Sequence, residues 1–325
     1  MKCRVICLAI CLGVWTPAAA DSDHAQAAFE RGDYRAALKQ AIPVAVEGDA
    51  AAQTLLGRLY FHGLGVPRNY TLAAAWYRKA AAQGVAAAQA VLGVLYLDGI
   101  GVRRNPTQAL DWLRRAARQG NADGQFGLGF AYYEGDSVSQ DYVEARKWLL
   151  AAANQGHAGA QYYLGFLYAD GHGIARDDAA AIKWWRRAAS QDHAGASTQL
   201  GLVYSEGRGA PEDHAEAVEW FRRAAEQGDP QAQVMLGMSY GKGRGAPRDY
   251  VEAHTWVNLG ASRLSPGRQR DIAVDYRAQI VEHMSPEEIN EAQKRARDWF
   301  RRNGKGSRGT AAPDDELTDY SIIVE

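Results

Sequence analysis

Only a few residue groups in this chain have the spacing of a catalytic or ligand-binding motif. The segment Gly237-Met238-Ser239-Tyr240-Gly241 has the G-x-S-x-G pattern of a nucleophilic serine on a strand-to-helix turn. Gly241, Gly243 and Gly245 alternate as glycines do in a phosphate-binding loop. Eight histidines offer imidazoles for acid–base or metal chemistry. Each group needs a particular element around it, so the elements decide which chemistry is open to it.

Three residue types recur along the chain with a constant step of 36 residues. The columns are Trp76, Trp112, Trp148, Trp184, Trp220, Trp256; Gly57, Gly93, Gly129, Gly165, Gly201, Gly237; and Tyr60, Tyr96, Tyr132, Tyr168, Tyr204, Tyr240. A fixed period of this length indicates stacked supersecondary units that bury their apolar faces against their neighbours. Six such units cover residues 49–262, and we number them repeats 1 to 6.

Each repeat predicts two helices. In repeat 2 the first helix carries Leu92 and Tyr96 on one face, with Gly93 allowing close approach of another helix. The second helix places Trp112 opposite small alanines at spacings of three and four. We expect the tryptophan column to fill the core and face the alanine and glycine columns. The sequence therefore predicts an all-α, right-handed α-solenoid of stacked antiparallel helix pairs.

Helix-end signals agree with this pattern. Polar N-cap residues precede every second helix, and Pro106 stands at a first helical position. The predicted caps are Asn69, Asn105, Asp141, Asp177, Asp213 and Asp249. Gln108, Glu144, Glu216 and Glu252 lie three residues later and predict capping boxes. Gly84, Gly120, Gly156 and Gly228 are predicted to close the second helices, with Asp192 as the exception.

The predicted elements do not give these motifs the surroundings that catalysis or phosphate binding requires. Ser239 falls inside a predicted helix rather than on an elbow, and no strand precedes the alternating glycines. His157 and His193 occupy equivalent turns, so they mark the repeat phase rather than a metal site. The sequence predicts no catalytic residue, no cofactor and no metal.

The repeat pattern resembles the Sel1-like repeat family, which is related to the tetratricopeptide repeat. The resemblance rests on Leu56-Gly57-x-x-Tyr60-x-x-Gly63-x-Gly65-Val66 followed by Ala73-x-x-Trp76-x-x-x-Ala80-Ala81, and on the equivalent residues of five further repeats. Ser137 and Gly260 depart from it. The resemblance implies an adaptor or scaffold for protein complexes. Cysteine-rich relatives reported as β-lactamases imply a hydrolase as a lesser alternative, but no S-x-x-K serine here stands in a plausible pocket.

Residues 1–20 have the features of a Sec-type signal peptide: Lys2 and Arg4, an apolar stretch, and Ala18-x-Ala20 before Asp21. Lipidation at Cys11 is a weaker alternative because Ile10 is bulky where a small residue is expected. All three cysteines lie in this segment, so the mature chain has no thiol. The sequence thus predicts export, with the periplasm favoured over secretion.

The remaining boundaries follow from the repeat phase. Residues 21–48 predict a truncated tetratricopeptide-like entry unit, and residues 263–302 predict two capping helices with Ile289, Ala292, Ala296 and Phe300 as a buried stripe. Residues 303–325 have the composition of a disordered tail. Of 37 basic and 38 acidic residues, removal of Lys2 and Arg4 leaves a net charge of −3, which argues against nucleic acid as a partner. No later segment predicts an integral membrane span.

The predicted partner site lies on the concave face of the first helices in repeats 3 and 4. Helical spacing places an aromatic cluster there, flanked by two carboxylates, with the composition of an interface hot spot. The residues are Phe126, Phe130, Tyr133, Tyr162 and Phe166, with Glu134 and Asp170. Two alternatives stay open: the rings pack on each other, or the apolar tail around Ile322 occupies the groove.

The resulting functional prediction is an exported, non-catalytic adaptor that binds a protein or peptide segment in its concave groove. It would act in assembly of cell-envelope complexes or in signalling regulation. A scaffold for envelope polysaccharide assembly is the alternative.

Overall fold

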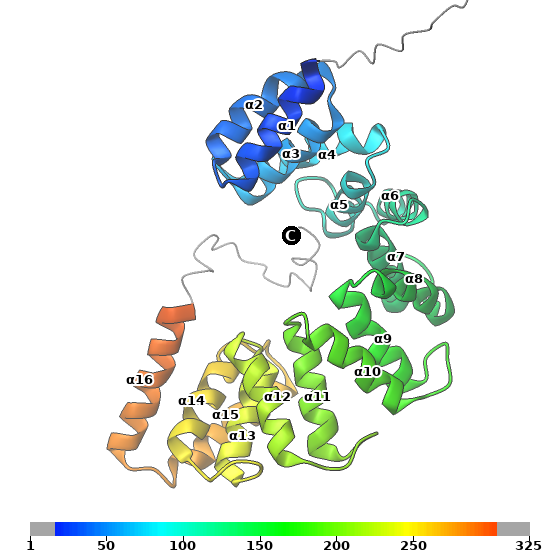
Figure 1. The fold of residues 1–325 in the computed structure, drawn as a ribbon. Coiled ribbons are helices and arrows are strands. Elements are labelled where there is room, and N and C mark those ends of the chain that lie inside the picture. Colours follow the sequence, from blue (N-terminus) through cyan, green and yellow to red (C-terminus); the bar gives the residue numbers. More distant parts are fainter. Residues whose placement is uncertain (1–16, 304–325) are drawn as a thin grey trace, which may run out of the picture. The chain divides into compact units, whose positions relative to one another are not determined.

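The computed structural model describes residues 17–303, which form helices joined by turns and loops and contain no strand (Figure 1). The chain divides into two compact modules, an N-terminal module that ends at Gly124 and a C-terminal module that begins at Gln125. Within each module, consecutive helices pair antiparallel, so the all-α solenoid architecture expected from the repeats is confirmed. Residues 1–16 of the predicted signal peptide (1–20) and residues 304–325 of the predicted tail (303–325) lie outside the described part, whereas residues 17–20 begin the first helix and Asn303 ends the last one.

The helices follow the repeat phase from one end of the described chain to the other. Those of the N-terminal module are α1 Pro17–Glu30, α2 Tyr34–Glu47, α3 Ala50–His62, α4 Tyr70–Ala82, α5 Ala86–Asp98 and α6 Pro106–Arg118. Helix α7, Ala122–Glu134, starts at the module boundary. The C-terminal module continues with α8 Tyr142–Asn154, α9 Ala158–Asp170, α10 Asp178–Ala189, α11 Ala194–Glu206, α12 His214–Glu226, α13 Pro230–Lys242, α14 Tyr250–Ala261, α15 Arg268–Val281 and α16 Pro286–Asn303.

Each predicted N-cap accepts a backbone N–H from the first turn of its helix, as Asp141 Oδ1 does from Glu144 N at 3.0 Å. The predicted capping boxes lack their return bond. The cap N–H is already donated to the first helix, at 3.0 Å from Asp141 N to Tyr132 O. The Glu144 carboxylate instead accepts the indole N–H of Trp148 at 3.0 Å. The tyrosine column thus uses its backbone to anchor the start of the second helix.

The glycine column brings the two helices of a repeat close together, but tryptophan is not the side chain that fills the space. A Cβ on Gly57 would stand 2.8 Å from ring carbons of Tyr77, the residue that follows Trp76. The pattern repeats in Gly93–Leu113, Gly129–Leu149, Gly165–Trp185, Gly201–Phe221 and Gly237–Val257. These partners are all at most 2% exposed. The prediction that the tryptophans fill the core is therefore wrong, because the residue that follows each tryptophan fills it.

The tryptophan column itself is half-buried in every repeat. Basic side chains cover the exposed indole faces, as Lys79 Nζ does at 4.1 Å from the ring centroid of Trp76. Equivalent contacts join Arg115 to Trp112 and Arg187 to Trp184.

A ladder of glutamine pairs, each with one buried and one exposed member, ties consecutive helices within each module. Gln161 Nε2 donates to Ala153 O at 3.2 Å, and its Oε1 accepts from Gln191 Nε2 at 2.9 Å. The same amide pair forms in Gln83–Gln53, Gln119–Gln89 and Gln155–Gln125. Repeat 5 interrupts the ladder, because fully buried Ser197 stands in the glutamine position.

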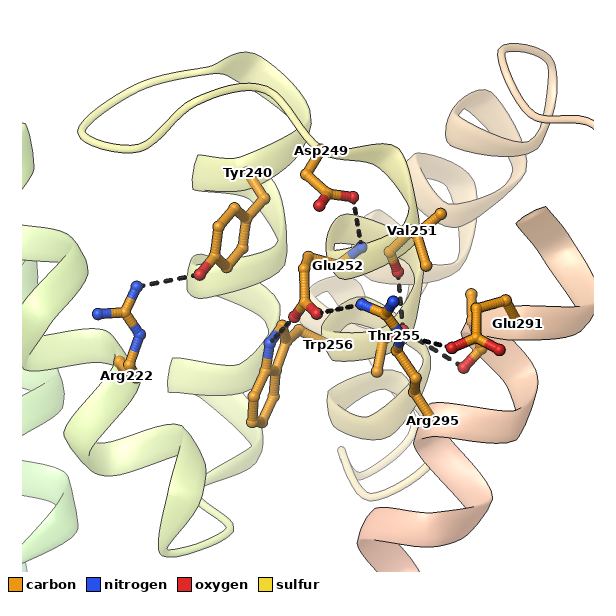
Figure 2. A network of polar contacts seen from close by, with 10 residues as sticks. Arg222, Tyr240, Asp249, Val251, Glu252, Thr255, Trp256, Glu291 and Arg295 are labelled. Atoms are coloured by element: carbon orange, nitrogen blue, oxygen red, sulfur yellow. Dashed lines mark hydrogen bonds and ion pairs between the residues drawn. The ribbon is translucent and has the colours of Figure 1, made fainter.

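Helices α15 and α16 close the C-terminal module. Ser285 and Glu288 form a complete capping box, with Glu288 N donating to Ser285 Oγ at 3.2 Å and Ser285 N to Glu288 Oε2 at 2.8 Å. Ala292 and Ala296 are buried as predicted, but Trp299 takes the place expected for Phe300, which is 39% exposed. Figure 2 shows the polar contact between this helix and repeat 6, where Arg295 donates to Glu252 at 2.6 Å.

The pairing of each glycine with the residue after tryptophan predicts a background-dependent effect of Gly57→Ala. With Tyr77 present, the added methyl overpacks the site, and we expect a loss of about 1–3 kcal/mol in the free energy of unfolding. In a Tyr77→Ala background the loss should vanish or become a gain, because alanine favours helix over glycine by about 1 kcal/mol.

Urea unfolding of the single and double variants measures this coupling. The matched control is Gly57→Ala in a Trp76→Ala background, where the loss should persist. Rescue by Trp76→Ala rather than by Tyr77→Ala would contradict the assignment.

Candidate functional site

The C-terminal module gathers the five predicted aromatic residues into one cluster. Helix α7 supplies Phe126, Phe130 and Tyr133, and helix α9 supplies Tyr162 and Phe166. Within a helix, Tyr162 and Phe166 meet edge to face with ring centroids 4.9 Å apart. The cluster therefore exists, as the helical spacing predicts, and the predicted residues come together.

A sixth ring, Tyr163, joins the two helices and was missed by the sequence reasoning. Its centroid lies 5.0 Å from Phe130, 5.2 Å from Tyr133 and 5.3 Å from Tyr162. Tyr163 lies three residues before Phe166, on the same side of the helix, and this spacing was the available signal. Because the rings of α7 contact those of α9 mainly through Tyr163, this residue organises the cluster.

Burial divides the predicted site into two parts. Phe126 is 2% exposed and Phe130 is 9% exposed, so both rings belong to the core and offer no surface to a partner. Tyr133, Tyr162 and Phe166 are half-buried and keep part of each ring accessible. The open alternative that the rings pack on one another is thus correct for the two phenylalanines of α7. Assignment of the other three rings to partner binding stays a prediction.

Two histidines fix the positions of rings in the cluster. His157 and His193 are the N-caps of α9 and α11, and their Nδ1 atoms accept backbone N–H groups at 3.1 and 3.2 Å. Their imidazoles stack on aromatic rings of the preceding repeat, with centroids 4.3 Å apart for His157–Phe126 and 4.5 Å apart for His193–Tyr162. Histidine at this cap position therefore both starts a helix and supports an aromatic neighbour.

A pocket of about 370 Å³ lies beside Tyr162. Its lining residues are Tyr162, Asp192, His193, Ala194, Gly195, Gln227 and Asp229. Gln227 is the residue that would complete the amide ladder, but Ser197 offers it no amide, and Gln227 Nε2 donates to Arg223 O at 3.2 Å. The pocket therefore lies where the ladder is interrupted.

The accessible side of the cluster is acidic. Glu134 and Asp170 are exposed at the ends of α7 and α9. Burial raises the pKa of the Tyr133 hydroxyl to about 12, and the negative charges of Asp170 and Glu134 add to the effect. Burial and the neighbouring Asp136 also raise the pKa of Glu134. A positively charged group would relieve this concentration of negative charge.

The Sel1 repeat, as defined by its family model, matches six consecutive segments of the chain: residues 50–85, 86–121, 122–157, 158–193, 194–229 and 230–263. The chain therefore belongs to the Sel1 repeat family. These repeats typically form protein-interaction scaffolds, so a protein is the class of partner that the family indicates.

Solved structures include similar proteins. A Sel1 repeat protein from Oxalobacter formigenes is 30% identical, aligns with a TM-score of 0.69, and is matched over 75% of this chain and 100% of its own. A protective antigen from uropathogenic Escherichia coli is 25% identical, with a TM-score of 0.39 over 93% of this chain and 81% of its own. An immunity protein from Pseudomonas aeruginosa is 23% identical, with a TM-score of 0.40 over 66% of this chain and 75% of its own. A search of curated proteins gave no match.

Within residues 17–303, no helix combines the length and apolar character needed to cross a membrane. The G-x-S-x-G segment lies inside α13, and Ser239 Oγ donates to Met235 O at 2.9 Å, one turn earlier in the same helix. The side chain therefore satisfies the helix backbone rather than standing on an exposed turn.

Proposed function

We propose that this protein is an exported, non-catalytic adaptor that binds a segment of a partner protein on the first-helix face of repeats 3 and 4. The observation that carries the proposal is a set of accessible rings, Tyr133, Tyr162 and Phe166, held in place by contacts with one another, with Tyr163 and with His193. Aromatic side chains that are already ordered lose little conformational entropy on binding, which makes them effective anchors.

The chemistry of this surface favours a particular kind of segment. Apolar side chains would pack on the accessible ring faces, and a basic side chain would lie near Glu134 or Asp170. The pocket beside Tyr162 offers the additional carboxylates of Asp192 and Asp229. We therefore expect a partner segment that combines apolar residues with lysine or arginine. Such binding fits a role in assembling or regulating an envelope complex.

Removal of the two exposed carboxylates tests this surface without removing core atoms. Glu134→Gln combined with Asp170→Asn should reduce capture of the partner from an envelope extract by about 10-fold, because the basic residue of the segment loses its counter-charges. Quantitative mass spectrometry of proteins retained by the immobilised chain measures the change. A second variant, Tyr162→Ala with Phe166→Ala, should abolish capture while circular dichroism confirms a folded chain.

Glu206→Gln is the matched control, since Glu206 holds the position of Glu134 and Asp170 in repeat 5. Its capture should equal that of the natural chain. Unchanged capture by both folded test variants would exclude this face as the binding surface.

Export to the periplasm is part of the proposal and rests on the amino-terminal sequence, with its basic residues, apolar stretch and Ala18-x-Ala20. We expect cleavage after Ala20. Amino-terminal sequencing of the chain isolated from the periplasmic fraction should therefore begin at Asp21. Recovery of the chain from the cytoplasm with an intact amino terminus would contradict export.

A further inference from the structure

A repeated arginine–tyrosine contact joins consecutive repeats in both modules. Arg78 Nη2 donates to Tyr96 Oη at 3.0 Å in the N-terminal module. In the C-terminal module, Arg222 Nη2 donates to Tyr240 Oη at 3.0 Å, as Figure 2 shows, and Arg186 makes the same contact with Tyr204. The tyrosine belongs to the first helix of the next repeat, so each pair presents one guanidinium at a junction between repeats.

Two of these junctions also hold a carboxylate. Glu216 Oε1 accepts from the Arg186 guanidinium at 3.2 Å and from Trp220 Nε1 at 3.3 Å. At the next junction, Glu252 accepts from Trp256 Nε1 at 2.9 Å and from Arg295 at 2.6 Å, and Figure 2 shows it between these two donors. At both junctions, a glutamate three residues after the N-cap thus accepts hydrogen bonds from a tryptophan indole and from an arginine guanidinium.

The junction at Arg78 has the same arginine–tyrosine contact but lacks the glutamate three residues after the N-cap. Gln108 stands where Glu216 stands at the Arg186 junction, 108 residues later, and Arg104 and Asn105 stand where that junction has Glu212 and Asp213. Three acidic residues are thus replaced by one basic and two neutral ones. The indole N–H groups of Trp148, Trp220 and Trp256 donate to a glutamate four residues earlier, whereas Gln108 holds that position before Trp112.

These substitutions line an open pocket of about 670 Å³ between repeats 1 and 2. Its charged side chains are Arg78, Arg103 and Arg104, and no aspartate or glutamate lines it. Arg104 Nε donates to Leu97 O at 2.9 Å, which fixes its side chain, whereas Arg103 has no partner among the described residues. Asp98 acts electrostatically on Arg104 but lies outside the lining.

We propose that this pocket binds the carboxylates of an acidic peptide segment, with one carboxylate taking the place at Arg78 that Glu216 takes at Arg186. Guanidinium groups bind carboxylates through charge-assisted hydrogen bonds, and here they lack a carboxylate from the pocket itself. The volume and the spread of three arginines suit several acidic side chains on one strand of peptide rather than a small enclosed ion. The proposal rests on the proposed adaptor function, to which it adds a second binding surface of opposite charge.

The direct test is binding of a fluorescein-labelled hexaglutamate peptide to the purified mature chain, measured by fluorescence anisotropy. A hexaglutamine peptide of the same length is the ligand control. We expect saturable binding of hexaglutamate only, with an affinity that falls as salt is raised. Gln108→Glu supplies the missing acid from within and should weaken binding about 10-fold, as should Arg103→Ala.

Gln108→Glu leaves the backbone cap bond to Asn105 in place, and its unfolding temperature should be unchanged or higher because an acid is favourable in the first helical turn. Arg114→Gln is the matched control, since Arg114 holds the position of Arg78 in repeat 2 but lies outside the pocket. The affinity of this variant for hexaglutamate should equal that of the natural chain.

Natural affinity in both test variants would overturn the proposal, as would binding of inorganic phosphate with none of hexaglutamate. Because no cellular partner is used, failure here is separate from failure of the aromatic surface in repeats 3 and 4.

Discussion

The stacking of this protein depends on satisfying polar groups that its own helix packing buries. Gln161 accepts an amide N–H from Gln191, in the turn that follows α10, and donates one to the last turn of α8, so one side chain of α9 links three consecutive segments of the stack. A buried amide without partners costs about 1–3 kcal/mol, and the ladder removes this cost at every repeat where it forms. It also fixes the register between repeats, because glutamine reaches its acceptor at only one helical offset.

The fold and the proposed functions use different positions of the same 36-residue unit. Glycine, the buried residue after tryptophan, and the ladder glutamine recur because they set distances between helices. Tyr163, Arg103 and Gln108 lie outside these columns, where the chain varies from repeat to repeat without disturbing the packing. Variation inside a column has local consequences too: Ser197 breaks the ladder, and Gln227 then lines a pocket beside the aromatic cluster. The recurring residues thus keep the helix packing constant, and the residues that differ between repeats give each repeat its own surface.

Much of the frame could be predicted from the sequence because its signals are local. Asp141 as an N-cap depends on a few neighbouring residues, and this expectation was met. Asp192, the exception in the glycine column, adopts the left-handed conformation of the glycines at that position. Choices between adjacent faces of a helix were less predictable. Trp148 and Leu149 are both apolar, and only the packing shows that Leu149 faces Gly129. Likewise, the burial of Phe126 depends on His157 stacking against it from the next repeat, a contact that helical spacing within one helix does not contain.

The central claim, that the amide ladder couples the helices it joins, is tested most directly by a double-mutant cycle on Gln161 and Gln191. Urea unfolding of Gln161→Ala, Gln191→Ala and the double variant gives the interaction free energy between the two side chains. The account predicts a coupling of about 1 kcal/mol, with Gln161→Ala alone the more destabilising single change because it removes two side-chain hydrogen bonds whereas Gln191→Ala removes one. Additive effects of the two substitutions, with no measurable coupling, would contradict it.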